Sequence, residues 1–209
     1  MGTTDCTDAE SLGVDAPANV LLLAPSMSSG ARNACPNDSN VDEQNLLLVS
    51  LDGNPDRRLD VWRRNCGLPS TVGVVTWDES RGAAGVASSS GTSSLPTPGN
   101  ETISVTTVAG PDDLTGIGMK VSQCLSAWAD APERTAMCFD SVTTLLQYTD
   151  VQQAFRFLDV LTSRISAVDG IAQYHMDPAA LDDETVERIK GLFSHVFRFD
   201  TETGEWRPV

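Results

Sequence analysis

The sequence predicts an α/β protein in which helices cover both faces of a mostly parallel central sheet. Apolar runs of strand length alternate along the chain with amphipathic segments of helical length. The apolar runs are nearly continuous, which is typical of parallel strands that are buried on both faces. Two short segments at the C-terminus, joined by a turn, have the pattern of an edge hairpin. The predicted architecture is therefore a three-layer domain with the sheet in the middle.

The strands are predicted from short runs rich in Val, Leu, Ile and Thr, bounded by turn residues. In chain order the predicted strands are 19–24, 45–51, 71–77, 102–109, 134–141 and 171–176, followed by the terminal pair 195–200 and 204–209.

The helices are predicted from apolar residues spaced by three and four. Segment 56–66 carries Leu59, Trp62 and Cys66 at this spacing and is ended by Gly67. The other predicted helices run from Pro111 to about Ala129, over 151–170, and from an acidic entry at Asp182 or Asp183.

The chain of 209 residues is long enough for one domain with a sizeable core. We expect a single domain over 19–209, preceded by a flexible leader over 1–18. Residues 80–100 are rich in Ser, Gly and Pro and predict a flexible loop. No apolar run approaches the roughly 18 residues that a membrane-spanning helix needs, and no signal peptide is apparent. We therefore expect a soluble cytoplasmic protein without a membrane partner.

The chain is strongly acidic, with 29 acidic and 14 basic residues and a net charge of −15. Lys120 and Lys190 are its only lysines. Such an acidic, lysine-poor composition is typical of cytoplasmic proteins of salt-loving archaea, where molar salt screens the repulsion. An ordinary acidic protein is the alternative. The absence of a basic stripe makes nucleic-acid binding unfavourable, which also disfavours a role in DNA recombination.

The cysteines and histidines do not form a metal-binding pattern. The five cysteines are scattered and include no C-x-x-C pair, and the two histidines are 20 positions apart. We therefore predict reduced thiols and no metal site.

Ligands of open α/β sheets bind at the carboxyl ends of the strands, so the residues that follow each predicted strand are the candidates for chemistry. Asp140 and Ser141 follow the fifth strand. Asp140 either supports Mg²⁺ beside a bound phosphate or caps the next helix. His175, at the end of the sixth strand, is either a ligand contact or base, or a histidine packed within the sheet.

Four segments together resemble the RecA-superfamily ATPases of the KaiC and archaeal RadA type. In the family's order they are NVLLLAPSMSSGA (19–31), NLLLVSLDGNPDRRLDVWRRNCGLP (45–69), AMCFDSVTTLL (136–146) and IAQYHMDPAALDDETVERIKGLFSHVFRF (171–199). The resemblance implies a RecA-like domain over about 19–209, and the acidic composition is similar to that of divergent haloarchaeal members without an assigned function.

The phosphate loop implied by this resemblance is degenerate. The pattern G-x-x-x-x-G-K-[ST] uses glycines for close approach to phosphate, a lysine for charge and a hydroxyl for Mg²⁺. Here Ala24 and Ser29 fall on the glycines, Gly30 on the lysine and Ala31 on the hydroxyl position, and a shift by one residue also fails. Arg32 is the only cation nearby.

The acidic pair that supplies the catalytic base in the relatives is also reduced, because Asp52 is followed by Gly53. Loss of the lysine and the hydroxyl removes most of the charge stabilisation of the transition state. We therefore predict a non-catalytic regulatory or protein-interaction protein with no catalytic residues and no cofactor.

The alternative is an unconventional nucleotide-binding protein that takes ATP and Mg²⁺ with little or no hydrolysis. Its candidate nucleotide-binding residues are Ser26, Ser28, Ser29, Gly30, Arg32, Asp52, Asp140 and Ser141. The expected partner is another protein or an active paralogue, and the expected state is a monomer or homodimer.

Overall fold

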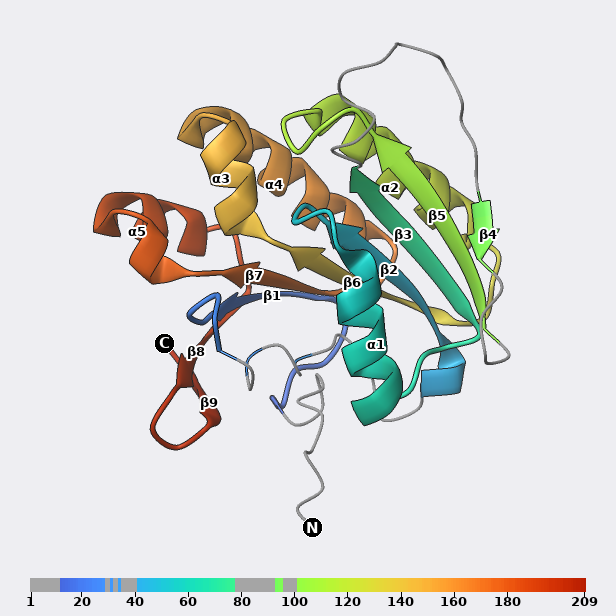
Figure 1. The fold of residues 1–209 in the computed structure, drawn as a ribbon, viewed down its shortest axis with the longest axis horizontal. Helices are drawn as coiled ribbons and strands as arrows, with labels where there is room; N and C mark the ends of the chain where they lie inside the picture. The colour runs from blue at the N-terminus through green and yellow to red at the C-terminus, as the bar shows by residue number, and fades with distance from the viewer. Residues whose placement is uncertain (1–11, 29–30, 32–33, 35–40, 78–92, 96–100) are drawn as a thin grey trace.

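The computed structural model describes residues 12–28, 31, 34, 41–77, 93–95 and 101–209 (Figure 1). These residues form one sheet with the strand order β4-β5-β3-β2-β6-β7-β1-β8-β9. The strands are β1 (Ala18–Leu23), β2 (Gln44–Ser50), β3 (Thr71–Trp77), β4 (Ser93–Leu95), β5 (Thr102–Val108), β6 (Arg134–Asp140), β7 (Ile171–Met176), β8 (His195–Asp200) and β9 (Glu205–Pro208). The interior pairs are all parallel, and only the edge strands β4 and β9 pair antiparallel.

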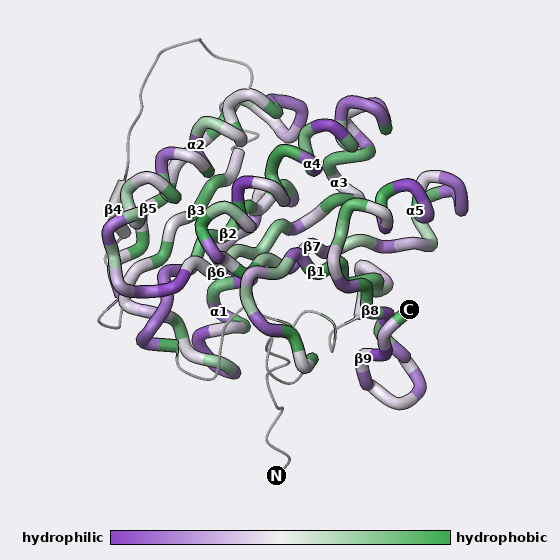
Figure 2. Tube along the Cα trace, turned by 180° about the vertical axis from the view of Figure 1, so that it is seen from behind, coloured by the Kyte–Doolittle hydropathy of each residue, from purple (hydrophilic) through white to green (hydrophobic). Residues whose placement is uncertain are grey.

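Helices cover both faces of the sheet. They are α1 (Pro55–Asn65), α2 (Leu114–Ala127), α3 (Val142–Tyr148), α4 (Val151–Ala167) and α5 (Asp183–Lys190), with 3₁₀ turns at Val41–Glu43 and Pro178–Ala180. Helices α2 to α5 pack on one face, and α1 lies on the other (Figures 1 and 2).

The two faces follow from the two-residue period of a strand. In β1, Leu21 and Leu23 belong to the core under α2 to α5, whereas Val20 and Leu22 belong to the core under α1. The α1 core also contains Trp62, which is fully buried and donates a hydrogen bond from Nε1 to the Ala34 carbonyl at 3.2 Å. A double-faced core of this kind explains why the strands read as continuous apolar runs.

The boundaries of α1 fix the position of its polar residues relative to the sheet. Asn54 caps the helix by accepting a hydrogen bond from the Arg57 amide, and Pro55 occupies the first turn. At the other end, Gly67 has a φ of 80° and donates to the Trp62 carbonyl. The helix therefore starts directly beside the carboxyl end of β2.

The predicted three-layer α/β fold and the C-terminal edge hairpin are confirmed, and β8 and β9 form that hairpin. Two local features differ from the expectations. Ser93–Leu95, within the predicted loop 80–100, form β4, while the rest of that loop lies outside the described residues. Val14, within the predicted leader, is buried in the α1 core. Residues 1–11 lie outside the described part of the chain.

The cysteines differ from the expectation of reduced thiols. Cys66, directly after α1, is disulfide-bonded, whereas Cys124 and Cys138 are not in a disulfide. Among the described residues, no helix has both the length and the apolar character that crossing a bilayer demands.

Candidate functional site

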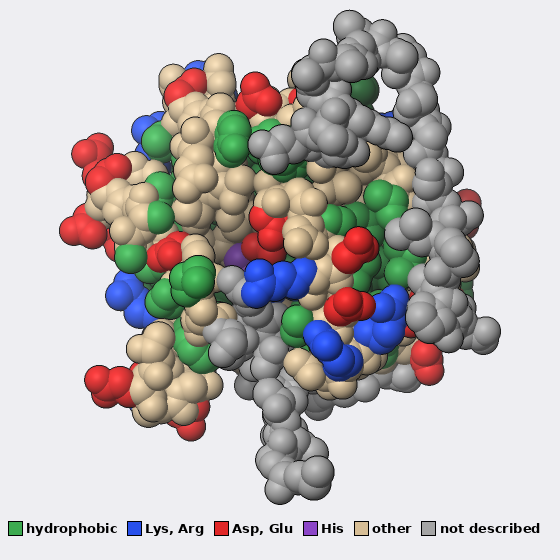
Figure 3. Space-filling view, in the orientation of Figure 1, with side chains coloured by type: hydrophobic (Ala, Val, Ile, Leu, Met, Phe, Trp, Pro, Cys, Tyr) green, Lys and Arg blue, Asp and Glu red, His purple; other side chains and the backbone are tan. Residues whose placement is uncertain are grey.

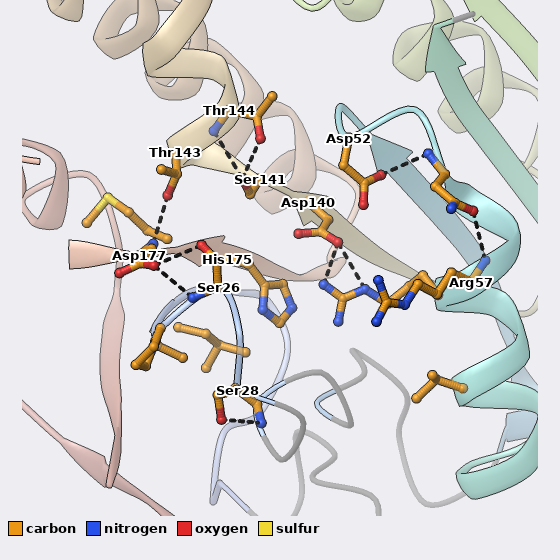
Figure 4. A pocket seen from close by; sticks show the side chains of 18 residues that line it. Ser26, Ser28, Asp52, Arg57, Asp140, Ser141, Thr143, Thr144, His175 and Asp177 are labelled. Carbon is orange, nitrogen blue, oxygen red and sulfur yellow. Dashed lines mark hydrogen bonds and ion pairs between the residues drawn. The ribbon is translucent and has the colours of Figure 1, made fainter. Parts of the chain in front are cut away.

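A cavity of about 210 Å³ opens where the carboxyl ends of β1, β2, β6 and β7 meet the start of α1 (Figure 4). Parallel strands bring their carboxyl ends to one edge of the sheet, and the loops after them form the walls of a crevice there. Acidic and basic side chains gather on this face of the molecule beside α1 (Figure 3). The cavity is therefore the position at which a fold of this class binds a ligand.

Strand register aligns three polar residues on neighbouring strands, and two of them, Asp140 and His175, line the cavity. Ser50 of β2 pairs with Asp140 of β6, and Asp140 pairs with His175 of β7. Asp140 lies two residues after Cys138, which belongs to the α1 core, so its side chain points to the same face as α1. His175 reaches this face for the same reason, because Leu22, its partner in β1, belongs to the α1 core.

Arg58 of α1 forms an ion pair with Asp140. Its Nε and Nη2 atoms donate to Oδ2 of Asp140 at 3.1 and 2.5 Å. The side chains are only 9% and 20% exposed, so water screens the pair weakly. Burial is the largest single influence and would lower the pKa of Arg58, but the charge and hydrogen bonding of Asp140, with smaller contributions from Cys138 and Asp52, together raise it. Asp140 is therefore neutralised by a cation of the protein itself.

His175 is buried beside this ion pair. It is 8% exposed, and its Nε2 atom has no hydrogen-bond partner among the described residues. Burial lowers the pKa of His175 to about 3, and the positive charge of Arg58 contributes in the same direction against the opposing effect of Asp140. The imidazole is therefore neutral at physiological pH. Its Nε2 atom is a buried polar group of the cavity that lacks a hydrogen bond within the described residues.

The loop after β1 is bonded to the protein itself. Ser26 donates from its amide and hydroxyl to Oδ2 of Asp177, at 2.7 and 2.8 Å. The Ser28 amide donates to the Pro25 carbonyl at 2.9 Å and closes a turn. Burial works to raise the pKa of Asp177, but the hydrogen bonds from Ser26 and Ala179 outweigh it and lower the pKa. A charged carboxylate therefore accepts the amide and the hydroxyl of Ser26, so that these two groups of the loop are already bonded within the protein.

Two further polar groups of the cavity also have internal partners. Asp52 accepts hydrogen bonds at Oδ1 from the Ser50 hydroxyl at 2.6 Å and from the Asn54 amide at 3.0 Å. Ser141 caps α3 and accepts the Thr144 amide at 3.1 Å. The Asp140–Ser141 peptide bond is cis. For Asp52, Oδ2 remains without a hydrogen-bond partner among the described residues.

Arg57 differs from its neighbour Arg58. It lines the cavity and is exposed, and its guanidinium makes no hydrogen bond or ion pair within the described part of the chain. Arg57 and Asp52 thus lie in one cavity with opposite charges, but they do not form an ion pair with each other.

The cavity brings together five of the candidate residues predicted from the sequence, namely Ser26, Ser28, Asp52, Asp140 and Ser141. The other three, Ser29, Gly30 and Arg32, lie outside the described residues. Sequence reasoning missed Arg57 and Arg58 as site residues. The helical spacing contained a signal for one of them, because Arg58 lies four positions before the buried Trp62 and so shares its face. Within the described residues, no cluster of His, Cys, Asp and Glu is suited to hold a metal ion.

The chain belongs to DUF7504, a family of unknown function, whose pattern matches residues 17–199. No curated protein matches the sequence.

Solved structures show the fold. One similar protein, PH0250 from Pyrococcus horikoshii OT3, has a TM-score of 0.58 at 8% identity, over 96% of this chain and 91% of that one. The KaiC-like protein PH0186 of the same organism has a TM-score of 0.54 at 11% identity, over all of this chain and 84% of that one. The resemblance to KaiC-like, RecA-superfamily folds is thereby confirmed, and at these identities it concerns the fold alone.

Proposed function

We propose that this protein is a non-catalytic member of the RecA-like fold that acts by binding, in a regulatory role, rather than by hydrolysing a nucleotide. The observation that carries the proposal is the ion pair between Arg58 and Asp140. An Asp at this position supports Mg²⁺ beside the phosphates in P-loop ATPases. Here the guanidinium supplies the positive charge, so that Mg²⁺ would have to displace a buried cation of the protein.

The loop after β1 supports the same conclusion. Its Ser26 amide, which would be available to a phosphate in an anion-binding loop, is held by Asp177. A phosphate approaching this loop would meet the carboxylate of Asp177 and would have to replace two short hydrogen bonds. The residues that flank the loop are therefore arranged to hold it in place without a ligand.

The regulatory role would be exerted through protein contacts in the cytoplasm, with the protein as a monomer or homodimer. In the loop after β1, Met27 is 87% exposed, between Ser26 and Ser28, which both line the cavity. An exposed methionine is an adaptable apolar contact for a protein partner.

The test is titration of the protein with Mg-ATP at molar KCl by calorimetry, together with an assay of phosphate release. We expect neither saturable binding at micromolar ATP nor release of phosphate above a protein-free control. Micromolar binding that requires Mg²⁺ and is lost in Asp140→Ala would replace the proposal by the alternative, an unconventional nucleotide-binding protein. Phosphate release by the wild type that is lost in Asp140→Ala would show that the site is catalytic.

A further inference from the structure

We propose that the cavity binds a small zwitterion of the amino-acid type, with its carboxylate on Arg57 and its ammonium group on Asp52, without a metal ion. The inference rests on the proposed function, because it needs a cavity that Mg²⁺ and nucleotide do not occupy. It specifies the class of ligand for that cavity.

Most polar groups of the cavity are already bonded within the protein. Asp140 is paired with Arg58, and Asp177 is bonded to Ser26 and Ala179. Ser141 is used as a helix cap. The Arg57 guanidinium and Oδ2 of Asp52 remain without a hydrogen-bond or ion-pair partner in the described residues, although the charge of Asp52 also acts on Arg58. A charged ligand that binds here without breaking these internal bonds would contact the Arg57 guanidinium and Oδ2 of Asp52.

The charges of the cavity favour a ligand without net charge. The cavity contains two arginines and three aspartates, and the whole chain has a net charge of −15. A multiply charged anion such as a nucleotide phosphate therefore meets more repulsion than attraction. A zwitterion adds no net charge, and it places a negative group on Arg57 and a positive group on Asp52. The planar guanidinium matches a carboxylate through two parallel hydrogen bonds.

The buried imidazole of His175 lies between Ser26 and Arg57 in the view of Figure 4. Its Nε2 atom is unpaired within the described chain, although burial of an unpaired polar group is costly. This points to a polar ligand in the cavity, because a ligand group or a water molecule ordered by it can bond to the imidazole. The orphaned nitrogen is independent of the charges on Arg57 and Asp52.

The volume of the cavity suits a small ligand. The cavity volume of about 210 Å³ lies below the range of about 300–1,000 Å³ that is usual for pockets of drug-sized ligands. A complete nucleotide would extend beyond it, whereas an amino acid is of suitable size.

The experiment first screens the proteinogenic L-amino acids for a rise in melting temperature at molar KCl, without Mg²⁺ or nucleotide. The amino acid with the largest shift is then titrated by calorimetry. We expect saturable binding, and at least tenfold weaker binding of acetate and methylammonium, which each carry only one of the two charges. Failure of every amino acid to bind, or equal binding of acetate, would overturn the inference.

The variants Arg57→Gln and Asp52→Asn test the two assigned groups. Each should weaken binding of that amino acid at least tenfold. The matched control is Arg64→Gln, because Arg64 is an exposed arginine of the same helix that does not line the cavity. An equal loss in Arg64→Gln, or no loss in Arg57→Gln, would contradict the assignment. The Mg-ATP assay reports on the proposed function separately, because these titrations contain neither component.

Discussion

The two walls of the cavity use similar polar residues in different ways. On the β1–β7 wall, Ser26 and Asp177 bond to each other, and the Asp177 amide donates to the Thr143 hydroxyl at 2.7 Å. On the α1 wall, Arg58 is held by Asp140, while the guanidinium of the adjacent Arg57 has no hydrogen-bond or ion-pair partner in the described residues. Polar residues that line the same cavity thus bond to each other on one wall, whereas on the other wall one guanidinium stays available for a ligand.

The ion pair of the α1 wall should have the largest effect on stability. Arg58→Met leaves the Asp140 carboxylate without its cation, and we expect a loss of about 3 kcal/mol in the free energy of unfolding. The measurement is urea denaturation at constant molar KCl. Arg207→Met is the control, since Arg207 pairs with Asp200 while its own side chain is 59% exposed, and its loss should cost below about 1 kcal/mol.

A double variant tests whether the loss comes from the unpaired charge. Arg58→Met combined with Asp140→Leu removes both charges, and we expect it to recover part of the stability. A double variant no more stable than Arg58→Met alone would mean that lost packing around Arg58 explains the loss.

The hydrogen bonds between Ser26 and Asp177 on the β1–β7 wall should have the second-largest effect on stability. Asp177→Ala removes the acceptor of both Ser26 bonds and of the Ala179 amide, and we expect a loss of about 1–2 kcal/mol. Urea denaturation again measures it. Glu187→Gln is the control, because the pair of Glu187 with Lys190 is on the surface. If the two variants lost the same stability, Asp177 would not hold the loop.

His175 links the two walls and should make stability depend on pH. Its pKa is about 3 in the folded protein and about 6.5 in an unfolded chain, so the unfolded state binds the proton first as the pH falls. Stability from this residue is complete above pH 6.5 and falls by up to about 1.4 kcal/mol per pH unit towards pH 3. Unfolding curves of wild type and His175→Gln at several pH values measure the difference. Parallel pH profiles would exclude this role.

Arg57 should have the smallest effect on stability. The Arg57→Gln substitution removes no side-chain hydrogen bond or ion pair of the described residues, so we expect a change within about 0.5 kcal/mol by urea denaturation. Together with the expected loss of ligand binding, this result would show that Arg57 serves the ligand and not the stability of the fold. A loss as large as that of Arg58→Met would show that Arg57 is part of the structural network.

The sequence predicted the parallel sheet well because its signal is local. Buried strands such as β2, with the segment LLLVS, show an apolar run that depends only on neighbouring residues. The strand β4 was missed because Ser93–Leu95 pair with β5 through backbone groups, within a segment whose composition is that of a loop.

The site could be predicted only in part. The position of Asp140 at the end of a strand is visible in the sequence, but its partner Arg58 is 82 residues away and meets it through strand order and helix placement. The same holds for Ser26 and Asp177, which are 151 residues apart. Bonds of this kind decide whether a polar residue faces a ligand or another side chain, and no local pattern encodes them.

The hairpin at the end of the chain has a consequence for how copies of the protein meet. An uncovered edge of a sheet offers unpaired backbone groups to a strand from another molecule. Here β9 forms that edge, and it carries the charged residues Glu205 and Arg207 and the amide-less Pro208. Charge and proline are both unfavourable for adding a strand. The hairpin therefore protects the long parallel sheet against growth from this side into an aggregate.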